Sequence, residues 1–259
     1  MANKRQKGYI KKVYPPISEP EEWPLLKLSR DKKQFLSNVV NESINRVSRA
    51  KNTRSRLIEE LESTLYREKQ RLKQKSWDID PEDDPDFWKD ITNNLVELSN
   101  EPEKHQGLEQ EILKQIVERY TDEIAGRFKR SKYKLARRIM TFWFARLLNA
   151  ARIKKFGSFF RNDLTLQDKI HIIGEPERVR KLAKLGTVVL LPTHFSNLDP
   201  VLMGWVIETL GLPPFQYAAN LHLFNIKTFA YFMNSLGSYK VDRRKKNRIY
   251  TETLRSYSS

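Results

Sequence analysis

Hydrophobic positions along the chain predict helices in its first half. Residues 30–75 contain no glycine and no proline, and apolar residues recur there at helical spacing, which predicts one long helix or two. The same spacing predicts further helices over roughly 109–126 and 131–153. Residues 1–29 hold four prolines and scattered lysines, and they predict an extended lead segment.

After residue 160 the pattern changes to short apolar runs that alternate with helical segments. The runs predict strands at 169–173, 187–192, 215–219 and 238–241. Helices are predicted at 177–185, 198–210, 226–236 and 247–257. The run from Thr187 to Pro192 is continuously apolar, as in a strand buried on both faces of a parallel sheet. This alternation indicates an α/β fold with a mostly parallel sheet flanked by helices, preceded by an all-helical N-terminal region.

Changes in composition divide the chain into five segments. They are an extended basic lead (1–29), a helical region (30–76), an acidic linker broken by prolines (77–108), an amphipathic helical region (109–160) and the α/β domain (161–259). We expect the last segment to be the N-terminal part of its domain.

Charge is distributed in blocks. Lysine and arginine number 48 against 32 acidic residues, which gives a net charge of +16. Residues 1–76 carry a net charge of +10, 77–125 carry −11, and 126–190 carry +13. Basic blocks attract phospholipid head groups, phosphorylated substrates or nucleic acid, although each block is equally well explained as a set of solvated helix faces.

The helix predicted over 131–153 has a wide apolar face flanked by lysine and arginine. Such a helix either lies on a membrane surface or packs in the core with a solvated basic side. No apolar run reaches 18 residues, so we expect no transmembrane helix, and no secretory signal is expected behind the basic start. The chain has no cysteine, which excludes disulfides and thiol catalysis.

A histidine and an aspartate follow the predicted strand 187–192. His194 falls in the turn at the carboxyl end of that strand, where open α/β sheets bind their ligands. Asp199 falls near the first turn of the next helix, where the helix dipole favours a carboxylate. Together they form a candidate catalytic pair, with the histidine as general base. An aspartate that caps the helix beside a structural histidine is the alternative.

A second segment, Gly237-Ser-Tyr-Lys-Val-Asp-Arg243, places a glycine before a short strand and an arginine after it. An arginine in that position can bind a phosphate through two parallel hydrogen bonds. Taken alone, the segment is also compatible with an ordinary basic loop.

Together these segments resemble a known family. Thr193-His194-Phe-Ser-Asn-Leu-Asp199 resembles the His-x4-Asp signature of the glycerolipid acyltransferases, and residues 237–243 resemble their second conserved block. Residues 218–221, Ala-Ala-Asn-Leu, are similar to a stretch of the glycerol-3-phosphate acyltransferase branch. The resemblance covers about residues 165–259.

The resemblance implies an acyl transfer of phospholipid synthesis. His194, oriented by Asp199, would take a proton from a hydroxyl of glycerol 3-phosphate or lysophosphatidate, and the oxygen would attack the thioester of acyl-CoA or acyl-carrier protein. Arg243 and Gly237 would bind the acceptor's phosphate. No cofactor and no metal would be needed, and the protein would work on the cytoplasmic face of a membrane. The other candidates to line the site are Thr193, Ser196, Asn197 and Asn220.

The family's third block, a Pro-Glu-Gly-like turn, is absent from this sequence, which ends at Ser259 about where the preceding strand should begin. We therefore expect a truncated form with little or no transferase activity on its own. The alternative function is a catalytically inactive protein that binds a lipid surface. Nucleic-acid binding is disfavoured, because the basic blocks lack interleaved aromatic residues and known recognition motifs.

Overall fold

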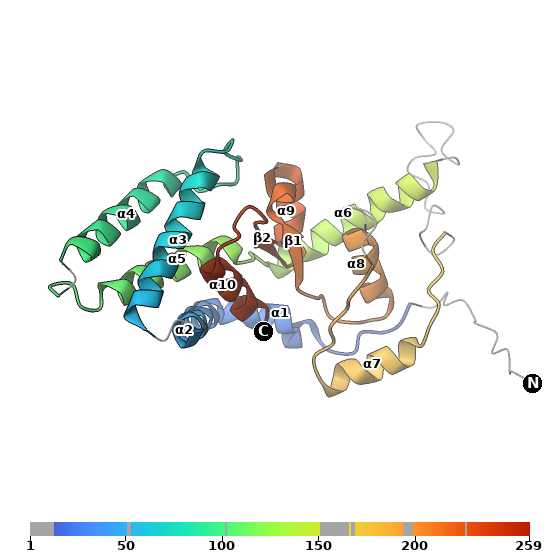
Figure 1. Ribbon diagram of the computed structural model, residues 1–259. Coiled ribbons are helices and arrows are strands. Elements are labelled where there is room, and N and C mark those ends of the chain that lie inside the picture. Colours follow the sequence, from blue (N-terminus) through green and yellow to red (C-terminus); the bar gives the residue numbers. More distant parts are fainter. Residues whose placement is uncertain are drawn as a thin grey trace, which may run out of the picture. The chain divides into compact units, whose positions relative to one another are not determined.

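The structure is a computed structural model that describes residues 13–50, 53–101, 103–150, 166, 169–193, 199–225 and 227–259. The chain divides into two compact units (Figure 1). The first unit comprises residues 1–27, 128–216 and 235–237, and the second unit comprises 28–127, 217–234 and 238–259.

Five long helices form the core of the second unit. They are α2 (Lys32–Ala50), α3 (Arg54–Leu72), α4 (Asp84–Asn100), α5 (Leu108–Ile124) and α10 (Arg248–Ser258). Their apolar faces meet in one cluster that includes Val47, Leu61, Trp88, Ile116 and Ile249, each at most 1% exposed. The region 30–75 thus holds two helices. Thr53 caps the start of α3, because its hydroxyl accepts a hydrogen bond from the Arg56 amide. The short helices η1 (Pro20–Glu22) and α1 (Pro24–Arg30) precede them.

Helix α4 lies inside the segment predicted to be an acidic linker, 77–108, and that prediction is wrong for residues 84–100. Asp84 and Asp86 occupy its first turn beside a proline, all of which favour a helix start. Trp88, Ile91 and Leu95 are buried at helical spacing. The charges at the start of this segment obscured a genuine apolar stripe behind them.

A parallel pair of strands lies in the second unit. Strand β1 (Tyr217–Asn220) pairs with β2 (Ser238–Val241), and the 3₁₀ turn η4 (Leu221–Asn225) and helix α9 (Lys227–Ser235) connect them. This is a strand–helix–strand unit, so the predicted strands at 215–219 and 238–241 and the α/β fold with its helical N-terminal region are confirmed. Strand β2 contacts the end of α5 at Gly126, where an added Cβ would lie 2.6 Å from the carbonyl oxygen of Ser238.

The first unit contains α6 (Arg130–Leu148), α7 (Pro176–Leu185) and α8 (Asp199–Thr209). Helices α6 and α8 pack together through a small cluster around Phe144, Ala145 and Trp205. Among the described helices, none is both long enough and apolar enough to cross a membrane.

The strands predicted at 187–192 and 169–173 do not form. Val189 and Leu191 are 74% and 91% exposed, and residues 187–193 are irregular. Only an isolated bridge occurs at Ile172. Strands need a hydrogen-bonded neighbour, and the sheet of the described residues consists of β1 and β2 alone.

Candidate functional site

Of the predicted catalytic pair, Asp199 lies at the start of α8. Asp199 is the first residue of that helix and is half-buried, so its carboxylate lies where the helix dipole favours a negative charge. Thr193 is exposed just before it. His194, Ser196 and Asn197 lie outside the described residues, so the contact between His194 and Asp199 stays a prediction.

Two other predicted residues lie at the carboxyl ends of the parallel strands. Asn220 ends β1, and its side-chain oxygen accepts a hydrogen bond from the amide of His222. Arg243 follows the end of β2 and is exposed. Because Asn220 is in register with Val241, both residues lie at the edge where open α/β sheets bind ligands. Within the described part of the chain, the Arg243 guanidinium has no ion-pair or hydrogen-bond partner.

Gly237 has a positive φ of 91°, which side chains rarely adopt. It is buried, and an added Cβ would lie 2.7 Å from Cδ1 of Leu25 and 3.5 Å from the ring of Phe128. The need for glycine here therefore follows from the turn after α9 and from close apolar packing. Its predicted part in phosphate binding stays a prediction.

The neighbouring Arg244 is held on three sides. Its guanidinium donates to both oxygens of Asp80, at 2.5 and 3.0 Å, and to both oxygens of Asp242, at 2.8–3.2 Å. It also stacks over the ring of Trp77, 3.8 Å from the ring centre. Burial alone would raise the pKa of Asp80, but the hydrogen bonds from Arg244 and from the Trp77 amide outweigh it and leave that pKa lowered. Arg244 thus stabilises the loop after β2 through its ion pairs, whereas the Arg243 side chain is exposed to solvent.

This difference predicts opposite outcomes for two adjacent substitutions. Arg244→Gln is expected to destabilise the protein by about 1.5–3 kcal/mol, because it leaves two nearly buried carboxylates without their charged partner. Arg243→Gln should leave the stability unchanged. Urea unfolding at pH 7 measures both.

The pH dependence gives a control for the Arg244 prediction. Since the folded protein lowers the pKa of Asp80, its contribution to stability is present above the ordinary pKa near 4 and is lost as the pH falls below it. The gap between wild type and Arg244→Gln should therefore narrow on acidification. A gap that stays constant from pH 7 to pH 3 contradicts the assignment.

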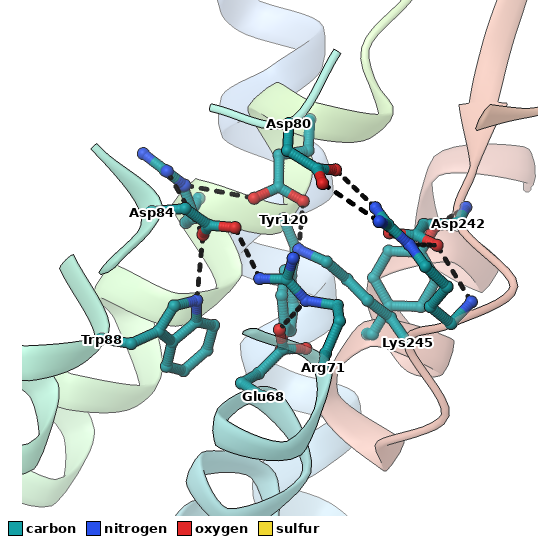
Figure 2. Close-up of polar contacts among 12 residues, drawn as sticks. Glu68, Arg71, Asp80, Asp84, Trp88, Tyr120, Asp242 and Lys245 are labelled. Carbon is teal, nitrogen blue, oxygen red and sulfur yellow. Dashed lines mark hydrogen bonds and ion pairs between the residues drawn. The ribbon is translucent and has the colours of Figure 1, made fainter. Parts of the chain in front are cut away.

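A buried network of polar side chains lies beside this loop (Figure 2). Arg71 donates to Glu68 at 2.5 Å and to Asp84 at 2.6 Å. Glu68 also accepts from the Tyr120 hydroxyl at 2.8 Å and from the Asn247 amide at 3.1 Å. Asn247 in turn caps α10 by accepting from the Tyr250 amide. The network thus joins α3, α4, α5 and the start of α10 within the second unit.

A pocket of about 310 Å³ opens next to this network, at the carboxyl ends of β1 and β2. The lining residues come from the segment 71–84, the end of α5 and the strand ends: Arg71, Ile79, Asp80, Pro81, Asp84, Arg119, Asp122, Glu123, Arg127, Leu221, Lys240, Asp242 and Lys245. Sequence reasoning missed this pocket. The one available signal was charge, since the acidic block 77–125 faces the basic run 243–246.

Comparison with known proteins places this region in a class. Residues 171–258 match the model of the acyltransferase family. The matched segment contains both predicted motifs and the strand–helix–strand unit. Residues 171–258, about a third of the chain, are therefore similar to an acyltransferase domain.

Similar curated proteins include glycerol-3-phosphate acyltransferases, in line with the resemblance of the two motifs. The chain is 37% identical over 84 residues to a glycerol-3-phosphate acyltransferase of Haemophilus influenzae, a match that covers 32% of this chain and 10% of that protein. It is 25% identical over 174 residues to one of Actinobacillus pleuropneumoniae, covering 66% of this chain and 19% of that protein. The chain thus spans less than a fifth of the length of these relatives. No solved structure matches the chain.

Proposed function

We propose that the protein transfers a fatty acyl group from acyl-CoA or acyl-carrier protein to a hydroxyl of glycerol 3-phosphate in phospholipid synthesis. The observation that carries this proposal is the family match over residues 171–258, which includes His194, Asp199 and Arg243 in the order of the family motifs. The similar proteins are named glycerol-3-phosphate acyltransferases, which favours glycerol 3-phosphate over lysophosphatidate as the acceptor.

In the proposed mechanism His194 is the general base and Asp199 orients its imidazole. The acceptor's oxygen bonds to the thioester carbon as His194 takes the hydroxyl proton. The carbon–sulfur bond then breaks, and the thiolate leaves with the proton that His194 returns. The exposed Arg243 binds the acceptor's phosphate through two parallel hydrogen bonds. This route requires no metal and no acyl-enzyme.

Helix α6 supports a peripheral position on a membrane surface. Leu135, Trp143 and Leu147 are each at least 50% exposed on it. Exposed lysines and an arginine flank them: Lys132, Lys134 and Arg138. Apolar side chains beside cations suit the boundary between acyl chains and anionic head groups. This is also the observation that favours the second candidate function, a non-catalytic protein bound to a lipid surface.

Release of CoA tests the proposal. With acyl-CoA, glycerol 3-phosphate and anionic vesicles, the rate of CoA release by the wild-type chain is expected to be low, because the sequence lacks the Pro-Glu-Gly-like turn, and any release is expected to require the acceptor. His194→Ala should lower this rate by about 10²–10⁴-fold, the usual contribution of a general base. Arg243→Gln should raise KM for glycerol 3-phosphate far more than it lowers kcat.

Two outcomes separate the candidates. Acceptor-dependent release that persists in His194→Ala would contradict the proposed mechanism. Binding to vesicles without any CoA release would instead support the lipid-surface protein. Trp143→Ala tests the membrane contact of α6. It should weaken binding to vesicles and leave the protein folded.

A further inference from the structure

The pocket at the strand ends has the dimensions of a small-ligand site. Its volume of about 310 Å³ lies at the lower end of the range for ligand pockets. Lys240 and Asp242 reach it from β2 and the residue after it, and Leu221 reaches it from the residue after β1. Asp80, Asp84, Arg71 and Lys245 surround the same space (Figure 2). All these residues belong to the second unit.

The carboxylates that line the pocket are nearly all neutralised by cations of the protein. Arg244 binds both Asp80 and Asp242. Arg71 and Arg119 bind Asp84, and Lys245 pairs with Glu123. The remaining lining carboxylate, Asp122, is exposed. Most carboxylates of the pocket are therefore already paired with cations of the protein.

Two cations remain without such partners. Among the residues that the structure describes, neither Arg127 nor Lys240 has a hydrogen bond or ion pair from its side chain. Arg127 follows α5 and is exposed, whereas Lys240 is half-buried in β2. Both line the pocket. Arg127 and Lys240 are thus the two cations of the described pocket lining whose side chains can bind an anion without losing a partner in the protein.

The electrostatics of Lys240 favour an anion beside it. Burial is the main cause that lowers the pKa of Lys240 to about 8, and the positive charges of Arg127 and Lys32 lower it further. Glu123 and Asp122 act in the opposite direction and do not compensate. Lys32, whose ammonium donates to the Gly126 carbonyl, has a pKa lowered by burial and then by Arg127. A bound anion would relieve this repulsion.

We propose that the pocket binds a small phosphate-bearing anion between Arg127 and Lys240. Arginine offers a planar pair of donors to phosphate oxygens, and lysine adds a compact charge. This site goes beyond the proposed transfer reaction. Arg243, assigned there to the acceptor's phosphate, is not among the residues that line the pocket.

Calorimetry on the whole chain at pH 7 tests the site, with inorganic phosphate and glycerol 3-phosphate titrated separately. Lys240→Met and Arg127→Gln should each weaken binding of the tested anion by at least about tenfold, the usual loss with a charged hydrogen bond. Lys246→Gln changes an exposed lysine outside the pocket lining, so it is the matched control and should bind both anions as the wild type does. Similar affinity for both probes points to free phosphate, and tighter binding of glycerol 3-phosphate points to an organic monoester. Unchanged affinity in both pocket variants would overturn the proposal.

Chemical labelling tests the site in the wild type, where no variant has to fold. Lys240 should react readily with acetic anhydride near pH 8, because much of it is then an uncharged amine. Phosphate should slow this reaction several-fold and leave that of the exposed Lys246 unchanged. Equal labelling of Lys240 with and without phosphate would refute the site. If phosphate protects Lys240 from acetylation equally well in His194→Ala, the pocket binds the anion independently of the proposed catalysis.

The affinity should also depend on pH. The protonated form of Lys240 binds the anion, so affinity is expected to fall as the pH rises through about 8 and beyond. The groups that face Lys240 and share this dependence are Arg127, Lys32, Glu123 and Asp122. In Lys240→Met this fall should disappear. An identical fall in that variant would argue against Lys240 as the binding group.

Discussion

Arg71→Met is expected to destabilise the second unit by about 3–5 kcal/mol, the usual cost of breaking a buried ion pair. The Arg71 side chain is only 4% exposed, and the carboxylates of Glu68 and Asp84 that it binds are 1% and 3% exposed. Without the guanidinium both acids would remain buried beside each other. Part of the penalty would be relieved when one of them takes up a proton.

The control for Arg71 is an ion pair of the same chemistry on the surface. Arg46 contacts Glu42 one turn away on α2, at 2.9 Å, and both side chains are at least a third exposed. Arg46→Met should cost less than about 0.5 kcal/mol. Urea unfolding followed by circular dichroism compares the two variants. Equal effects would show that the buried network contributes no more than a surface pair.

Trp88→Ala is expected to cost about 3–5 kcal/mol, as large-to-small substitutions of buried aromatic residues do. Trp88 is 1% exposed in α4, packs edge-on against Phe87 and donates its indole N–H to Asp84 at 3.1 Å. The substitution would create a cavity and remove a hydrogen bond from the charged network. It also tests whether residues 84–100 form a packed helix.

Trp143→Ala is the matched substitution at an exposed tryptophan. Trp143 is 58% exposed on α6, so its truncation should change the free energy of unfolding by less than about 1 kcal/mol. Thermal or urea unfolding of both variants gives the comparison. If Trp88→Ala lowered the free energy of unfolding as little as Trp143→Ala does, α4 would not pack on the core as described.

Local sequence patterns predicted the elements that local forces determine. The helix predicted over 247–257 is present as α10, and the strand predicted at 238–241 is present as β2, where β1 supplies its hydrogen-bonded neighbour. The run 187–192 failed, because a strand depends on neighbours that no local pattern supplies. Helix α4 was missed because prolines and acids at its start outweighed a regular apolar stripe that begins at Trp88.

The candidate site was predictable only in part for a similar reason. Arg243 and Arg244 are adjacent and chemically identical, so only the resemblance to the family's second block distinguished Arg243, and nothing in the sequence indicated the structural role of Arg244. The partner that distinguishes them, Asp80, lies 164 residues away. The lining of the pocket likewise comes from segments as far apart in the sequence as Arg71 and Lys245. Family motifs indicate individual positions, but they do not indicate which distant charges neutralise them.

The contact at Gly126 positions β2 through backbone atoms, whereas the side chains of β2 determine the charge of the pocket. At that point the backbone of α5 meets the backbone of β2 with no side chain between them, so the strand is positioned by main-chain atoms. Lys240 lies two residues after Ser238 on the same strand, so this contact also positions Lys240. Substitution of the Lys240 side chain is therefore expected to change the charge presented to the pocket more than the position of β2. The same scaffold could then accept cations or neutral compounds, which makes this position a natural starting point for redesigning ligand preference.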